Sequence, residues 1–173
     1  MTGRSPDPDQ AESEKMKMTQ AGFDSQLEAQ TLRQMLRAHE GVRAFPYLDS
    51  VGKCTIAVGR NLSDRGLTVA EIDFLLETDI ALAHTILDGW LPGWRDFSAP
   101  RRHALISMAF NLGGPRLASF VQLRAALMAG DFDRAADCAL DSRWAVQTGR
   151  RALEIARLLR SGVGGVAAPG AGA

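Results

Sequence analysis

The sequence predicts an α+β fold that is mainly α-helical. Apolar residues recur with helical spacing before residue 39 and after residue 68, whereas residues 39–61 show short alternating stretches separated by glycines. An apolar stripe over residues 68–91 runs for about six turns, which is long enough to connect two lobes. With 173 residues, 46% of them hydrophobic, the chain can bury a full core. We therefore expect one folded domain, residues 25–162, in which that helix joins lobes at 25–67 and 95–162.

The first helix is expected to begin at Ser25, because Glu28 three positions later completes a capping box. Residues 1–24 are polar and have few apolar anchors, so we expect them to form a flexible tail. The helix should end near Glu40, because Gly41 is typical of the position just past a helix C-terminus. Glu40 would then face the negative end of the helix dipole, which favours a protonated carboxyl group.

The glycine-rich stretch that follows predicts a hairpin. Residues 45–48 form a short edge strand that contains a proline, residues 49–52 form a turn, and residues 53–59 alternate as a half-buried strand. Asp49 then lies at the turn and Thr55 on the return strand, and both can face the end of the first helix. The alternative for Asp49 is a purely structural one, in which its side chain closes the turn on its own backbone.

The rest of the chain is expected to be helical. Residues 61–66 form a loop, and Thr68 begins the long connecting helix, which ends at Pro92. Trp144 is a candidate core residue. The further helices expected are one from residue 99 to the Gly-Gly-Pro at 113–115, one over 117–128, one capped by Asp131 and a last one capped by Thr148 that ends at Gly162. Residues 163–173 are expected to form a second flexible tail.

Composition excludes several classes of protein. Twenty basic and twenty acidic residues give zero net charge, which argues against a dedicated nucleic-acid binder. Residues 95–173 nevertheless hold 11 basic and 6 acidic residues, which suits an anionic surface such as a cell-wall polymer. Cys54 and Cys138 have no metal-ligand spacing, so we expect reduced thiols, no metal and no cofactor. The sequence has no apolar run of 18 residues, so we expect no stable membrane insertion. It shows no export signal, so we expect the protein to stay in the cytoplasm until it is released. We also expect a monomer.

Two carboxylates in unlike settings are the minimum equipment for hydrolysing a glycosidic bond. One must be protonated to donate to the leaving oxygen, and the other must be ionised to activate water. Glu40 at the helix end suits the acid and Asp49 on the turn suits the base. The Thr55 hydroxyl, which both donates and accepts, can hold the water.

The stretch LRAHEGVRAFPYLDSVGKCTIAVGRNL resembles the active-site segment of the phage-type lysozymes, the endolysins of glycoside hydrolase family 24. That pattern is Glu-Gly, Tyr-x-Asp, Gly and a Thr-Ile-Gly-x-Gly strand. It runs here from Glu40 to Gly59, where the strand reads Thr-Ile-Ala-Val-Gly. The runs APRRHALISMAFNLGGPRLASF and SRWAVQTGRRALEIARLLRSG resemble later segments of the same family. The resemblance covers about residues 31–162 in one order.

This resemblance implies a lysozyme-like fold and hydrolysis of the β-1,4 bond between N-acetylmuramic acid and N-acetylglucosamine in peptidoglycan, with inversion. It implies Glu40 as general acid, Asp49 as base and Thr55 as its support. Inversion needs carboxyl groups roughly 6.5–9.5 Å apart, which leaves room for a water. The resemblance also implies glycan binding by Phe110 and Asn111. It leaves two roles open, a free endolysin that a holin pore releases to the wall for host cell lysis and a wall-cutting part of a virion.

Four features depart from the family pattern. Ala57 replaces the first glycine of the strand, so a positive φ there would be strained. Arg60 stands where the family's type member has a histidine, and the connection between Gly59 and Thr68 is short. Cys138 replaces a polar residue that lines the cleft. None of these departures removes a carboxylate.

Three rival interpretations remain. A lytic transglycosylase would cut the same bond with Glu40 alone and form an anhydro sugar. A non-catalytic wall-binding or virion structural module could keep the same fold. Residues 99–128 could also form a helix-turn-helix that binds DNA, although Phe110, Leu117 and Phe120 in that stretch resemble core residues.

Overall fold

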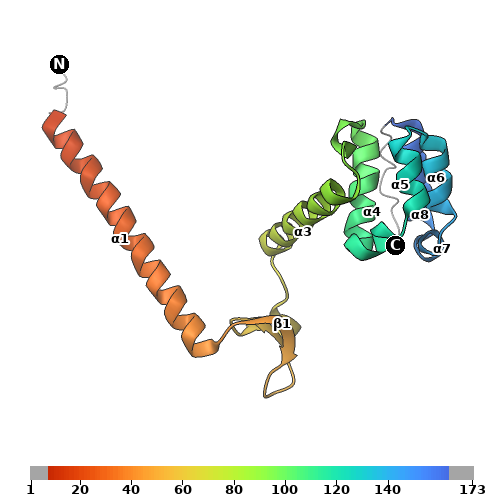
Figure 1. The fold of residues 1–173 in the computed structure, drawn as a ribbon. Coiled ribbons are helices and arrows are strands. Elements are labelled where there is room, and N and C mark those ends of the chain that lie inside the picture. The colour runs from red at the N-terminus through yellow and green to blue at the C-terminus, as the bar shows by residue number, and fades with distance from the viewer. Residues whose placement is uncertain (1–7, 164–173) are drawn as a thin grey trace, which may run out of the picture. The chain divides into compact units, whose positions relative to one another are not determined.

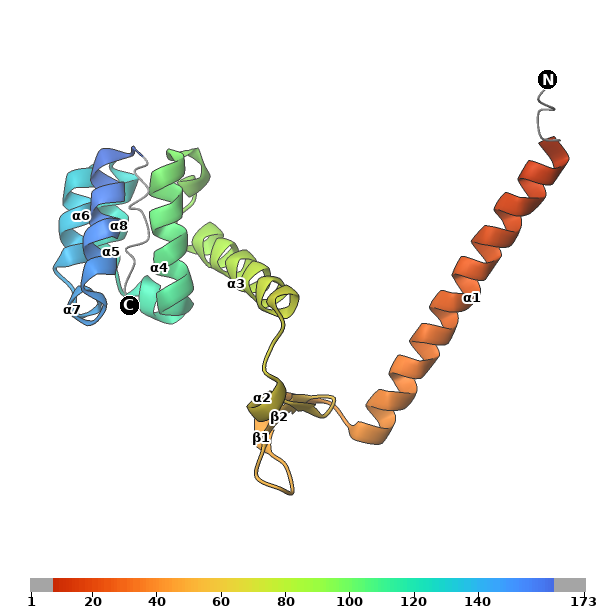
Figure 2. The same cartoon turned by 180° about the vertical axis from the view of Figure 1, so that it is seen from behind.

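The computed structural model describes residues 8–163, and it divides into a unit up to Thr68 and a unit from Val69 onward. The first unit holds α1 (Pro8–Glu40), β1 (Arg43–Leu48), β2 (Cys54–Ala57), β3 (Arg60–Asn61) and α2 (Leu62–Arg65). The second holds α3 (Val69–Trp90), the 3-10 turn η1 (Trp94–Asp96), α4 (Ala99–Ala118), α5 (Val121–Met128), α6 (Phe132–Leu140), α7 (Arg143–Thr148) and α8 (Arg150–Ser161). Figures 1 and 2 show these elements from opposite sides. Helices with one small antiparallel sheet confirm the expected mainly helical, lysozyme-like α+β class.

Helix α1 ends at Glu40 as expected, but the expected start at Ser25 is wrong. The helix begins at Pro8, so the part of the expected tail that the structure describes is helical, and residues 1–7 lie outside the described range. The physical reason is intrinsic preference: the run from Gln10 to Gln20 is rich in Ala, Glu, Lys, Met and Gln, all good helix formers. Gly41 follows the helix with a φ of +73°, as a glycine at a helix end commonly does.

The sheet has the strand order β1-β2-β3, and both pairings are antiparallel. Strand β1 is an edge strand, which is where its proline is tolerated. Tyr47 pairs with Thr55 and Leu48 with Cys54, so the turn at 49–52 lies where the sequence predicted it. The register shifts between Arg43 and Tyr47, which marks an irregularity in β1.

The segment expected to be a loop at 61–66 is instead strand β3 followed by the short helix α2. Asn61 caps this helix, because its side-chain oxygen accepts a hydrogen bond from the backbone N–H of Asp64 at 3.0 Å. Gly66 closes it, donating its N–H to the carbonyl of Leu62. A four-residue helix is too short to be stable alone, so its side-chain contacts define it.

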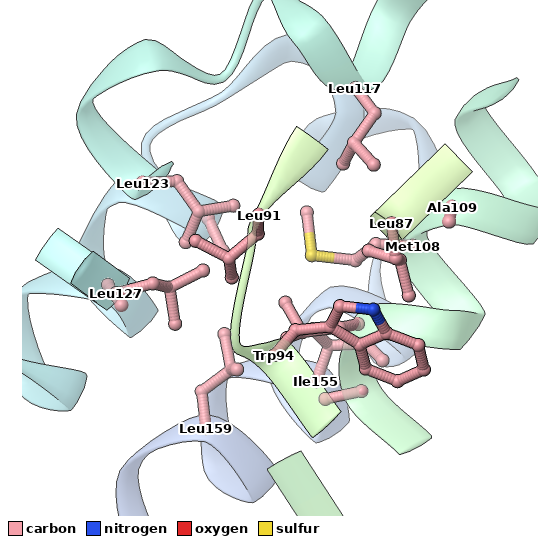
Figure 3. Close-up of a cluster of buried hydrophobic side chains, with 14 of the residues drawn as sticks. Leu87, Leu91, Trp94, Met108, Ala109, Leu117, Leu123, Leu127, Ile155 and Leu159 are labelled. Atoms are coloured by element: carbon pink, nitrogen blue, oxygen red, sulfur yellow. The ribbon is translucent and has the colours of Figure 1, made fainter. Parts of the chain in front are cut away.

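The hydrophobic core lies in the second unit. Figure 3 shows side chains from α3 and the turn after it, from α4, α5 and α8 meeting in one cluster. Leu87, Leu105, Met108, Leu117 and Leu159 are each fully buried. Trp144 on α7 is 5% exposed, which confirms it as a core residue.

Two expected helix boundaries in this unit are wrong. The stretch 117–128 is not one helix, because the chain turns at Ser119 and Phe120 before α5 begins. The break expected at the glycines is present, since Gly113 has a non-helical φ of +68° inside α4. Thr148 does not cap the last helix. Its hydroxyl donates back to the carbonyl of Trp144 within α7, and α8 begins only after Gly149.

Helix α8 ends as expected at Gly162, which has a left-handed φ of +59°. The guanidinium of Arg101 donates to the carbonyls of Leu159 and Arg160, two of the acceptors that a helix end leaves unpaired. The same guanidinium lies 3.5 Å from the ring centroid of Phe132. Arg101 thereby ties α4 to α8 and α6.

Across residues 8–163, no helix combines the length and the apolar composition that a membrane crossing requires. Cys54 and Cys138 are both free thiols.

Candidate functional site

Glu40 is the last residue of α1, and its side chain is exposed. Its Oε2 atom lies 3.7 Å from the point that a Cβ atom on Gly59 would occupy. Gly59 belongs to the turn between β2 and β3, so the carboxyl at the helix end reaches the sheet. The α1 terminus and the β2–β3 turn together place this acid.

Asp49 uses its two carboxylate oxygens differently. Oδ1 accepts hydrogen bonds from the backbone N–H groups of Val51 at 3.0 Å and Lys53 at 2.9 Å, which closes the turn. Oδ2 faces the hydroxyl of Thr55 at 3.5 Å. The turn-closing role expected as an alternative is therefore present, but it occupies one oxygen and directs the other toward β2.

Thr55 is 4% exposed. Its hydroxyl lies 3.2 Å from the carbonyl of Lys53 and 3.5 Å from Asp49 Oδ2. A hydroxyl has one proton and two lone pairs, so it can donate to one of these oxygens and accept from another group. A buried hydroxyl beside a carboxylate oxygen is a suitable anchor for a water molecule.

The pKa of the Asp49 carboxyl is lowered from its ordinary value. The main cause is the hydrogen bond from the Lys53 backbone N–H, helped by the N–H of Val51, the Thr55 hydroxyl and the positive charge of Lys53, while desolvation opposes them. Asp49 is therefore ionised at neutral pH. That is the state that a proton acceptor needs.

Ala57 ends β2 with a φ of +59°, and among the described residues it is the one non-glycine with a positive φ. The replacement of the family's glycine by Ala57 therefore places a residue with a Cβ in a strained backbone conformation. A left-handed conformation costs a residue with a Cβ about 1–2 kcal/mol. The strain lies in the same turn as Gly59, next to the Glu40 carboxyl.

Replacing Ala57 with Gly is expected to stabilise the sheet by about 1 kcal/mol, because glycine adopts a positive φ without steric cost. Tyr47, the only tyrosine of the chain, pairs with Thr55, so its ring NMR signals followed through urea unfolding report on the sheet. Ala44→Gly is the matched control in β1, where the backbone has no positive φ, and it should destabilise. A lower urea midpoint for Ala57→Gly would contradict the assignment of strain.

Arg60 pairs with Ile56 across β2 and β3. Its Nε and Nη2 atoms both donate to the carbonyl of Gly66, at 3.2 and 2.8 Å. The position that departs from the family pattern thus fastens the sheet to the end of α2.

Phe110 and Asn111 both lie on α4, in the second unit. Phe110 is 46% exposed, so the expectation that it is a core residue is wrong. Leu117 is buried and Phe120 packs against the core, as expected. The side-chain oxygen of Asn111 accepts a hydrogen bond from the indole N–H of Trp144 at 2.7 Å.

Asn111 lines a hollow of about 850 Å³, and Phe110 is not among the residues that line it. The lining mixes cationic, hydroxyl and amide side chains with apolar ones. It includes Arg116, Ser119, Phe120, Cys138, Ser142, Arg143 and Gln147. Cys138, one of the four departures from the family pattern, is thus among the residues that line this hollow.

Sequence reasoning gave Lys53 no part in the site, and it named Gly59 only as the last glycine of the family strand. The signal for Lys53 was present, because an Asp followed by a glycine-containing turn commonly accepts from backbone N–H groups downstream. The closeness of Gly59 to Glu40 could not be predicted in this way, because it joins two elements.

The chain matches the family model described as phage lysozyme over residues 37–160. It is also similar to the pre-baseplate central spike protein Gp5 of Enterobacteria phage T4, with 26% identity over 163 residues. The match covers 76% of this chain but only 28% of that relative. The matched family range contains Glu40, Asp49 and Thr55 and runs through most of the second unit. This chain belongs to the phage lysozyme family.

Proposed function

We propose that the protein is a peptidoglycan hydrolase, a lysozyme that cleaves the β-1,4 bond between N-acetylmuramic acid and N-acetylglucosamine with inversion. The observation that carries this proposal is that the two carboxylate oxygens of Asp49 have different partners. One oxygen is held by two backbone N–H groups and the other faces a buried hydroxyl, in the same unit as Glu40. Membership of the phage lysozyme family supports the substrate class.

In the proposed mechanism Glu40 donates its proton to the glycosidic oxygen as the bond to the anomeric carbon breaks. Asp49 Oδ2 accepts a proton from a water molecule that Thr55 Oγ1 holds, and the water oxygen attacks the anomeric carbon from the opposite face. One water is consumed, and the products are two sugars with one new reducing end. Asp49 suits its part because its lowered pKa keeps it ionised, the state from which it can accept a proton.

The products test this reaction against that of a lytic transglycosylase. Purified sacculi digested with the protein should yield muropeptides with reducing N-acetylmuramic acid ends, as measured by mass spectrometry. Digestion in ¹⁸O-water should label those ends. Anhydro products without the label would overturn the hydrolase proposal, because a transglycosylase closes the ring without adding water.

A second candidate concerns where the enzyme works. Similarity to a central spike protein favours a wall-cutting component of a virus particle over a free endolysin that a holin releases. Immunoblots of purified particles and of the soluble lysate separate the two. Detection in particles supports the virion component, whereas a soluble protein that lyses cells only with a pore-forming partner supports the endolysin.

A further inference from the structure

We propose that α2 is a brace that sets the position of Asp49 from outside the hairpin, and that Ser63 and Asp64 are positioning residues for the hydrolysis. This inference rests on the proposed function for its catalytic consequence. The structural part stands on contacts within the first unit. Neither residue is one of the proposed catalytic groups.

The brace begins where the β3 ladder stops. Strand β3 pairs only with Thr55 and Ile56 of β2, through Asn61 and Arg60. The next residue of β2, Cys54, donates its backbone N–H to Ser63 Oγ at 2.9 Å. The Ser63 side chain thus binds the backbone of Cys54, where β3 no longer pairs with β2. The two neighbours of Cys54, Lys53 and Thr55, both contact Asp49.

Asp64 holds the neighbouring residue by its side chain. Its Oδ1 atom lies 2.8 Å from Lys53 Nζ, and its Oδ2 atom accepts from the Asn61 side chain at 3.0 Å. The backbone N–H of the same Lys53 holds Asp49 Oδ1. The Lys53 and Asp64 side chains are 43% and 58% exposed, and such ion pairs contribute little to stability. The role of this ion pair is to fix the position of Lys53, whose backbone holds Asp49.

The brace is fixed at both ends. Asn61 caps its first turn, and Arg60 donates twice to the Gly66 carbonyl at its end. Among residues 15–68 Thr55 alone is buried, so no buried apolar side chain of this stretch holds the hairpin in place. Polar contacts from α2 therefore add to the pairing with β1 and β3 in positioning the strand that carries Thr55.

The test uses the full chain and soluble glycan strands as substrate. Ser63→Ala removes the acceptor of the Cys54 N–H, and kcat should fall about tenfold with KM within about twofold, since small misplacements of a reacting group slow chemistry more than binding. Ser63→Thr keeps the acceptor oxygen and should restore kcat. Ser25→Ala on α1 is the matched control and should leave both constants unchanged.

A second readout does not depend on activity. In ¹⁵N-labelled protein, hydrogen exchange at the Lys53 and Cys54 amides should be faster in Ser63→Ala than in the wild type, and at wild-type level in Ser63→Thr. Asp64→Ala should also speed exchange at Lys53, which keeps the test valid if Ser63→Ala does not fold.

Wild-type exchange in both alanine variants would overturn the brace. A loss of kcat that Ser63→Thr does not restore would also overturn it, as would a rise in KM equal to the loss of kcat. Failure of the proposed function is a separate result: the wild-type protein would then release no reducing ends, while the exchange data would still decide the structural part.

Discussion

Replacing Glu40 with Gln is expected to abolish lysis of cells whose outer membrane has been permeabilised. Glutamine keeps the size and polarity of the side chain at the end of α1 but has no proton to give to the leaving oxygen. Loss of a general acid costs about 10²- to 10⁴-fold in rate. The measurement is the decrease in turbidity of such cells, together with the release of reducing ends from purified sacculi.

Glu28→Gln provides the matched control, because Glu28 is an exposed glutamate on the same helix. It should lyse cells at the wild-type rate. Since Glu40 is also exposed, neither substitution should alter folding, and the circular dichroism of both variants should equal that of the wild type. Unchanged lysis by Glu40→Gln would remove Glu40 from the mechanism.

Replacing Asp49 with Asn should lower the rate of hydrolysis by about 10²- to 10⁴-fold while the turn remains closed. The asparagine carbonyl can still accept from the backbone N–H groups of Val51 and Lys53, but a neutral amide cannot take a proton from water. Initial rates on sacculi measure the loss. The chemical shifts of the Val51 and Lys53 amides show whether the turn is kept.

The lowered pKa of Asp49 also predicts a dependence on pH. A carboxyl whose pKa is lowered by folding stabilises the hairpin above its unfolded pKa, and this contribution is lost as pH falls through the folded pKa. Wild-type hairpin stability should therefore drop below about pH 4, the unfolded value for Asp. Asp49→Asn should lack this drop, and an equal drop in both proteins would assign it to other carboxyl groups.

Local signals were enough to predict the framework of the candidate site. Gly41 predicted the end of α1 and so the place of Glu40, and the Asp-Ser-Val-Gly turn placed Asp49 opposite the strand of Thr55. Each of these signals depends on backbone preference within a few residues. The roles of the three side chains remain proposals.

The features that local signals missed have two causes. Some depend on contacts between elements, and others have a local sequence that is typical of two different structures. Helix α2 exists because Ser63, Asp64 and Arg60 bind groups on other elements, and no helical period marks four residues. Thr148 has the side chain of a helix cap, but its hydroxyl bonds backward within α7, and Gly149 separates the two helices. The start of α1 was missed because its polar composition is also typical of a disordered tail.

The distribution of buried residues decides which measurement detects local unfolding of this protein. All three tryptophans lie in the second unit, in or beside the core, whereas the first unit holds the single tyrosine and both proposed catalytic carboxylates. A segment with little buried apolar surface opens at a lower free energy than a packed core. On gentle heating, activity and the Tyr47 ring signals should therefore disappear before tryptophan fluorescence changes. A thermal melt followed by tryptophan would report a sample as native after its chemistry had already been lost.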